Sequence, residues 1–86
     1  MDILTRYWFI FDVEDFVSPR SAGVTAYNLD DANRLLDERL FKELRRPPIK
    51  SVIENIDVST LDEGHVLPNI GVPTIRGVWY PNLNSY

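Results

Sequence analysis

The residue types that could perform acid–base or nucleophilic chemistry gather around the only histidine of the 86-residue sequence. His65 lies in the stretch DEGHVLPNIGVP, and Ser59, Thr60 and Asp57 stand a few residues upstream. A hydroxyl, an imidazole and a carboxylate are the parts of a nucleophile–base–acid set. No nucleophile-elbow glycine pattern surrounds either hydroxyl, so the sequence assigns no catalytic residue. The alternative is that His65 caps a turn beside Gly64.

Metal-binding and phosphate-binding patterns are absent from the sequence. There is no cysteine, and Asp57, Asp62 and Glu63 do not match the spacing of a zinc motif or a calcium loop. No glycine-rich run follows a strand-like segment and opens a helix, which is the pattern that cradles a nucleotide phosphate. We therefore expect no metal and no cofactor.

Two arginines stand in strand-like segments among aromatic residues. Such an arginine pairs with an internal acid, stacks on a ring or lines a binding face. We expect ion pairs of Arg6 with Asp57 and of Arg76 with Asp12. The alternative is that Arg6 and Arg76 contact a ligand, in a small enzyme or ligand-binding domain centred on His65.

Four strand-like segments and one helix must position these residues. Residues 6–13, 23–27, 50–58 and 74–80 are rich in β-branched and aromatic side chains. Residues 6–13 are apolar on both faces, which favours a central strand covered on both sides. The order predicts a single α+β domain over residues 1–86, with a small, mostly antiparallel sheet in β-β-α-β-β order and one amphipathic helix packed on one face.

The clearest periodic signal is the stretch NLDDANRLLDERLFKELRRPP, which predicts a helix over 29–45. Asn28 is a good N-cap, and Asp31 is placed to reach back to it as in a capping box. Basic residues near the far end suit the negative pole of the helix dipole. Pro47 and Pro48 then end the helix. The apolar stripe consists of Ala32, Leu35, Leu36, Leu40 and Leu44.

The proline- and glycine-bearing loop over 59–73 reads as a stiff connector. Prolines restrict the unfolded chain and fix the course of a loop, which suits a preformed binding surface. The sheet face away from the helix also needs cover. The loop, the C-terminal tail, a second copy of the chain or a partner could each supply it.

The net charge of −4 and the pI of about 4.7 argue against nucleic acid as a partner. The basic cluster at 34–50 is interleaved with acids and fits the end of the helix. The N-terminal run is broken by charges, so it predicts neither a signal peptide nor a membrane span. Without cysteine, a cytoplasmic location is the default expectation.

An acidic surface steers toward basic protein partners. The sequence thus favours a protein-binding module that docks a basic protein. We expect the contacts to come from acids after the first strand, from the loop and from the last strand. These residues are Asp12, Glu14, Asp15, Asp62, Glu63, His65, Trp79 and Tyr80.

Three stretches carry a family resemblance: YWFIFD, GVTAYNLDDANRLL and IDVSTLDEGHVLPNIGVPTIRGVWYP. They cover most of the chain, which resembles a family of small uncharacterised bacterial proteins with no established activity, so no residue roles follow from it. The small, acidic, cysteine-free profile is also similar in class to bacterial immunity proteins. That likeness implies an immunity or inhibitor protein that neutralises a basic toxin such as a nuclease. A structural homodimer subunit is a further alternative.

Overall fold

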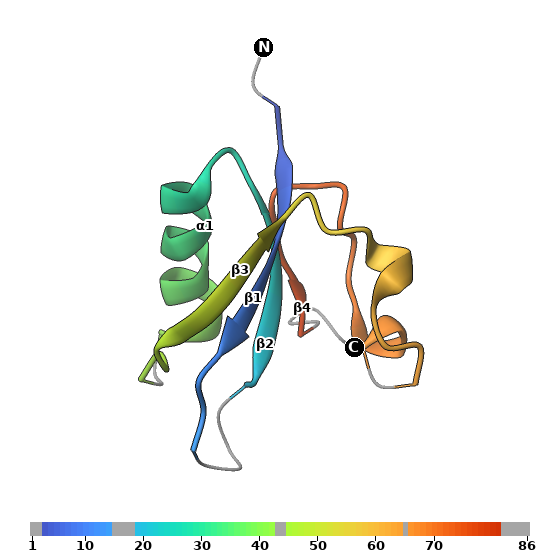
Figure 1. Cartoon of the computed structure of the whole chain (residues 1–86). Helices are drawn as coiled ribbons and strands as arrows, with labels where there is room; N and C mark the ends of the chain where they lie inside the picture. The colour runs from blue at the N-terminus through green and yellow to red at the C-terminus, as the bar shows by residue number, and fades with distance from the viewer. Residues whose placement is uncertain (1–2, 15–18, 43–44, 65, 82–86) are drawn as a thin grey trace.

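A computed structural model describes residues 3–14, 19–42, 45–64 and 66–81 of the chain. It contains a four-stranded antiparallel sheet in the order β3-β1-β2-β4, with one helix packed on it (Figure 1). The predicted α+β class and element order are confirmed. The elements are β1 (Thr5–Phe11), β2 (Ser21–Ala26), α1 (Leu29–Leu35), β3 (Ile49–Glu54) and β4 (Gly77–Tyr80).

β1 is a central strand, as its two apolar faces predicted. It pairs with β2 from Thr5 opposite Ala26 to Ile10 opposite Ser21, and with β3 on its other side. The pairing with β3 is irregular at Lys50. Ile10 pairs with Ser51 and Phe11 pairs with Ile49, so Lys50 is an extra residue with no partner in β1. Because side chains alternate along a strand, β1 contributes to a separate core on each face of the sheet.

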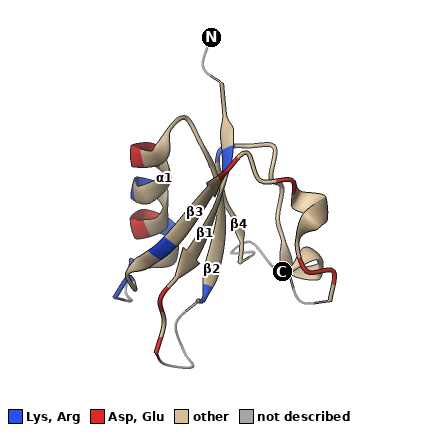
Figure 2. Cartoon of the chain, viewed as in Figure 1, with Lys and Arg blue, Asp and Glu red and all other residues tan. Residues whose placement is uncertain are grey.

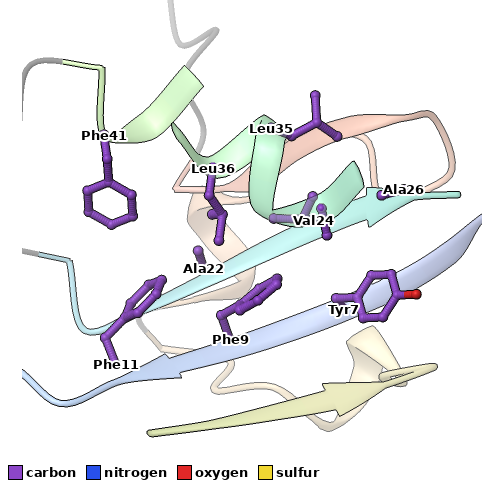
Figure 3. Close-up of a cluster of buried hydrophobic side chains, with 10 residues drawn as sticks. Tyr7, Phe9, Phe11, Ala22, Val24, Ala26, Leu35, Leu36 and Phe41 are labelled. Atoms are coloured by element: carbon purple, nitrogen blue, oxygen red, sulfur yellow. The ribbon is translucent and has the colours of Figure 1, made fainter. Parts of the chain in front are cut away.

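The first core lies between the sheet and α1, and we call it the helix-face core (Figure 3). Alanines on β2 leave room for the helix to approach, while phenylalanines on β1 fill the remaining space. Phe9 is completely buried there. The buried members are Tyr7, Phe9, Phe11, Ala22, Val24, Ala26, Ala32, Leu35, Leu36 and Phe41.

The second core lies on the opposite side of the sheet, and we call it the loop-face core. Figure 1 shows the segment that follows β3, with its short 3₁₀ turns at Val58–Thr60 and Leu67–Asn69, on that side. The loop is therefore a cover for the second sheet face, one of the four candidates. The buried members are Trp8, Ile56 and Trp79, and Ile10, Val58, Leu61, Val66, Ile70 and Tyr80 are partly buried around them.

The start of the helix agrees with the sequence prediction in one respect and differs in another. Asn28 Oδ1 accepts a hydrogen bond from the Asp31 N–H at 2.8 Å, so the predicted N-cap is confirmed. The Asp31 carboxylate does not reach back to Asn28. Its Oδ2 accepts from the N–H of Tyr27 instead, at 3.1 Å.

The predicted helix end at residue 45 is wrong. The α-helix ends at Leu35 and a π-helical turn continues it only to Leu40. This wider turn directs Phe41 into the helix-face core, where its ring meets Phe11 edge-on at 5.5 Å. Arg46 Nη1 donates to Asn33 Oδ1 at 2.7 Å, so Arg46 lies beside α1. A straight helix would separate these two residues by about 20 Å. Packing of one aromatic side chain has overridden the continuing helical pattern.

Three strands are also shorter than predicted, and β1 ends at Phe11 rather than at residue 13. β3 ends at Glu54 because Asn55 adopts a left-handed backbone conformation with φ of 56°. β4 begins only at Gly77, whose φ of 146° favours glycine and marks a turn into the strand.

In the part of the chain that the structure describes, no helix has the length and apolar character needed to cross a bilayer.

Candidate protein-binding surface

One end of the sheet brings four chain segments together. Thr5 at the start of β1 pairs with Ala26 at the end of β2, and Thr25 of β2 pairs with Gly77 at the start of β4. The first turn of α1 follows directly after β2. This end lies at the top of Figure 1, beside the N-terminus.

Large apolar side chains are exposed at this end, which we call the apolar end. Leu4 and Tyr27 stand next to the Thr5–Ala26 pair, and Ile75 precedes Arg76, whose guanidinium carbon lies 5.6 Å from the centre of the Tyr27 ring. Ile3 is 79% exposed and Ile75 is 62% exposed. The apolar end consists of Ile3, Leu4, Tyr27, Leu29 and Ile75.

An ion pair fixes the geometry of this end. Arg76 donates from Nε to Asp31 Oδ2 at 2.9 Å and from Nη2 to Asp31 Oδ1 at 2.5 Å, so the pairing is bidentate. Asp31 is only 8% exposed, and it also accepts from the Tyr27 N–H. The pair ties the start of α1 to the segment before β4 and holds Tyr27 between them.

The electrostatics show that this ion pair persists at neutral pH. The hydrogen bond from Arg76 lowers the pKa of Asp31 to about 2, with the Tyr27 N–H and the charge of Arg76 adding to the effect and burial opposing it. The same hydrogen bond raises the pKa of Arg76. Both groups are therefore charged across the physiological range, and the apolar end keeps its shape there.

Asp31 is the residue that sequence reasoning missed, since Asp12 was expected to pair with Arg76. Asp12 is exposed beyond the end of β1, and its N–H donates to the Pro48 carbonyl at 2.8 Å. The overlooked signal is that Asp31 lies four residues before Leu35, on the buried stripe of the helix. A carboxylate that is buried requires a cation or strong donors, and Arg76 meets that need.

Arg6 and Asp57 interact more indirectly than the expected ion pair. Arg6 Nε donates to the Ile56 carbonyl at 3.2 Å. Asp57 Oδ1 accepts from the Ser59 N–H at 3.0 Å and from its hydroxyl at 2.7 Å. These bonds from Ser59 are the main cause of the lowered pKa of Asp57, and the charge of Arg6 adds a smaller contribution. Asp57 thus caps the 3₁₀ turn at Val58–Thr60.

The two arginines of the enzyme alternative bind different elements. Arg6 engages the loop-face side of the sheet through Ile56, whereas Arg76 engages the first turn of α1 on the other side. His65 lies outside the described residues. Within the described ranges, no group of three acidic or histidine side chains is placed to hold a metal ion.

The acids predicted as partner contacts lie on two separate segments. Asp12 and Glu14 are exposed after β1, and Asp62 and Glu63 are exposed in the loop. Figure 2 shows these two acidic segments apart from each other. Asp62 Oδ1 also accepts from the N–H of Gly64 at 2.8 Å. Asp15 and His65 lie outside the described residues.

The two aromatic residues predicted as partner contacts belong largely to the loop-face core. Trp79 is 1% exposed, and its indole N–H donates to Thr25 Oγ1 at 3.1 Å. Its ring covers Gly23, where an added Cβ would lie 2.5 Å from ring atoms. Tyr80 is half-buried, with its ring 5.4 Å from that of Trp8. The expectation that Trp79 contacts a partner is wrong, because its indole is buried against the backbone of Gly23, which has no side chain to exclude it.

Comparison with protein-family models, curated proteins and solved structures found no match to this chain. The resemblance of the three sequence stretches to a bacterial family stays a prediction.

Proposed function

We propose that this protein is a binding module that docks a basic protein partner through its apolar end. The observation that carries the proposal is the set of exposed apolar side chains from three segments, residues 3–4, 27–29 and 75, at one end of the sheet. Exposed large apolar side chains gathered on one part of a surface mark interaction sites. Preorganisation by the Asp31–Arg76 pair reduces the ordering cost of docking.

The charges around the apolar end favour a basic partner. Asp30 is exposed in the first turn of α1, and Glu54 is exposed at the end of β3, where it pairs with Tyr7. Arg6 is an exposed cation beside Thr5, and the charge of Arg76 is already paired with Asp31. The chain as a whole carries a net charge of −4. Acids at the rim of an interface accelerate encounter with a basic surface and disfavour acidic competitors.

In its most specific form, the proposal is an immunity or inhibitor protein that neutralises a basic toxin such as a nuclease. The small size, the acidic charge and the resemblance in class to immunity proteins support this form. It predicts that the purified partner has an enzymatic activity, such as nuclease activity, which the chain suppresses at equal stoichiometry.

The proposal is tested by capture and reconstitution. The tagged full chain is used to capture proteins from a lysate of the source cells, and the candidate partner is then purified and titrated by calorimetry. We compare the wild type with the double variant Ile3→Ser/Ile75→Ser, which removes the two most exposed members of the apolar end. Ile49→Ser is the control, since Ile49 is 37% exposed and pairs with Phe11 at the opposite end of β1.

We expect the double variant to bind the purified basic partner at least about tenfold more weakly, since truncating two buried anchors costs on the order of 1–2 kcal/mol each. Ile49→Ser should bind like the wild type, and binding should weaken as salt increases. Equal affinity of the double variant and the wild type would remove the apolar end from the interface. An acidic partner, or affinity that does not respond to salt, would contradict the electrostatic part of the proposal.

A further inference from the structure

β3 presents an open edge of the sheet. It is the outermost strand in the order β3-β1-β2-β4, and among the described segments it pairs only with β1. Its six residues are poorly covered: Ile49 and Ile53 are exposed, and Val52 is half-buried. An edge of this kind offers unpaired N–H and C=O groups to another strand.

The sequence of this edge is complementary to itself. Lys50 and Glu54 stand two residues on either side of Val52. Both side chains are exposed, and neither forms a hydrogen bond or ion pair within the described part of the chain. If two copies pair antiparallel with Val52 opposite Val52, each Lys50 lies opposite the Glu54 of the other copy.

Other registers lose this match. A parallel pairing would set Lys50 opposite Lys50, and directly opposed like charges are destabilising. A shift of two residues in either direction sets Lys50 opposite Val52 or Ile56. Lysine on an edge strand normally opposes intermolecular pairing, so a register that neutralises it is selected over the rest.

We propose that β3 pairs antiparallel with β3 of a second copy of this chain, around a two-fold axis at Val52. The four-stranded sheets of the two copies would join into one continuous sheet, with β3 of each copy at its centre. Val52 pairs with Phe9 and Ile53 pairs with Trp8, so Val52 is on the helix side and Ile53 on the loop side. The axis places both α1 helices on the same face, and it sets the two Ile53 side chains diagonal to each other on the opposite face.

This pairing is limited in extent. The edge that is open to pairing runs from Lys50 to Glu54, because Pro47 and Pro48 lie just before β3 and the left-handed Asn55 follows it. A single short ladder buries less area than a standard stable interface. The dimer is therefore weak and forms in a concentration-dependent manner.

The experiment is sedimentation of the full chain over a concentration series up to about 1 mM, a range that captures a weak dimer. The variants are Lys50→Glu, Glu54→Lys and the charge-exchanged double variant Lys50→Glu/Glu54→Lys. Each single variant turns two attractive pairs into two repulsive ones, so the dissociation constant should rise about tenfold. The double variant restores opposite charges and should return to within about twofold of the wild type.

Lys42→Glu is the matched control for Lys50→Glu, because it makes the same change in net charge at an exposed residue outside β3. It should leave the dissociation constant unchanged. A wild type that stays monomeric throughout the series would overturn the proposal, and so would a double variant as weak as the single ones. The apolar end does not include β3, so capture of a heterologous partner by Lys50→Glu would be unaffected, and the two proposals fail separately.

Discussion

The two faces of the sheet are covered in different ways. The helix-face core is closed by α1 and its π-helical continuation, and ten buried side chains of the described residues meet there. The loop-face core is closed by an irregular segment, and three residues of the described ranges are buried in it. The loop satisfies its backbone through local turns, such as the Leu61 N–H to the Val58 carbonyl at 3.1 Å. A helix brings a dense apolar stripe, whereas a loop brings scattered side chains.

The sheet compensates for this difference with its own side chains. On the helix face, β2 supplies small residues such as Ala22 and Ala26 beneath α1. On the loop face, Trp8 and Trp79 stack with ring centroids 5.9 Å apart, so much of the apolar cover comes from the strands themselves. Aromatic rings bury large areas with few backbone constraints, which suits a face whose lid is irregular. The predictions below test how unequal the two cores are, from the largest expected effect to the smallest.

The largest effect is expected from truncation in the helix-face core. Phe9→Ala removes a completely buried ring and should lower the free energy of unfolding by about 3–5 kcal/mol. A domain of this size has roughly 4–13 kcal/mol in total. The matched change Ile10→Ala removes the next, half-buried side chain on the loop face and should cost only about 1 kcal/mol. Urea denaturation measures the free energy of unfolding of both variants. Equal losses would show that the two cores contribute equally to stability.

A smaller effect is expected where the loop-face core is tightest. Gly23→Ala places a Cβ 2.5 Å from the indole ring of Trp79, which is buried and has little room to shift. The expected loss is about 1–3 kcal/mol, with a changed near-ultraviolet circular dichroism signal from tryptophan. Gly64→Ala is the control, since its added Cβ meets nothing closer than 3.4 Å. A native spectrum and stability for Gly23→Ala would show that this core is loosely packed.

The Asp31–Arg76 pair joins the helix layer to the segment returning from the loop. The pKa of Asp31 is lowered in the folded state, so its contribution to stability is present above its ordinary pKa of 3.8 and is lost as the pH falls toward about 2. Because Arg76 is partly exposed, the expected contribution is about 1–2 kcal/mol. Denaturation between pH 7 and pH 2 measures it.

Asp31→Asn should remove most of this acid dependence and lower stability at pH 7 by a similar amount, about 1–2 kcal/mol. Asp30→Asn is the matched control, since Asp30 is the preceding residue in the first turn and is exposed. An acid transition that is unchanged in Asp31→Asn would show that another carboxylate carries it.

The smallest global effect is expected at the loop cover. Leu61→Ala truncates a half-buried side chain and should cost about 1 kcal/mol or less. Its local effect should be larger: the amides of Leu61 and Asn69, bonded within the loop, should exchange hydrogen faster. The amides of β1 should keep their protection. Parallel acceleration in β1 would mean that loop and sheet unfold as one unit.

The sequence predicted the local structure well where one residue's chemistry decides it. Asn28 marked the helix start, because an N-cap needs only a side-chain acceptor two or three residues before an N–H. The strand core of 6–13 was evident from its two apolar faces, which require cover on both sides. The helix end was missed, because a pattern of 3.6 residues cannot show that Phe41 packs better against Phe11 than on the helix.

The candidate site was much less visible in the sequence. The exposed members of the apolar end come from residues 3–4, 27–29 and 75, and each alone is an ordinary apolar residue. Trp79 looked like a contact residue in the sequence and is buried over Gly23 in the structure. Exposure is a property of the assembled layers, so residue type predicts it poorly.

By itself, the sequence determined the class of fold, the order of the elements and the acidic balance of the chain, because these depend on local periodicity and on composition. Only the tertiary structure decided that Arg76 pairs with Asp31, 45 residues away, and that the loop covers the second face. These contacts depend on burial. The carboxylate of Asp31 is buried, so it needs a cation, and the folded chain places Arg76 beside it.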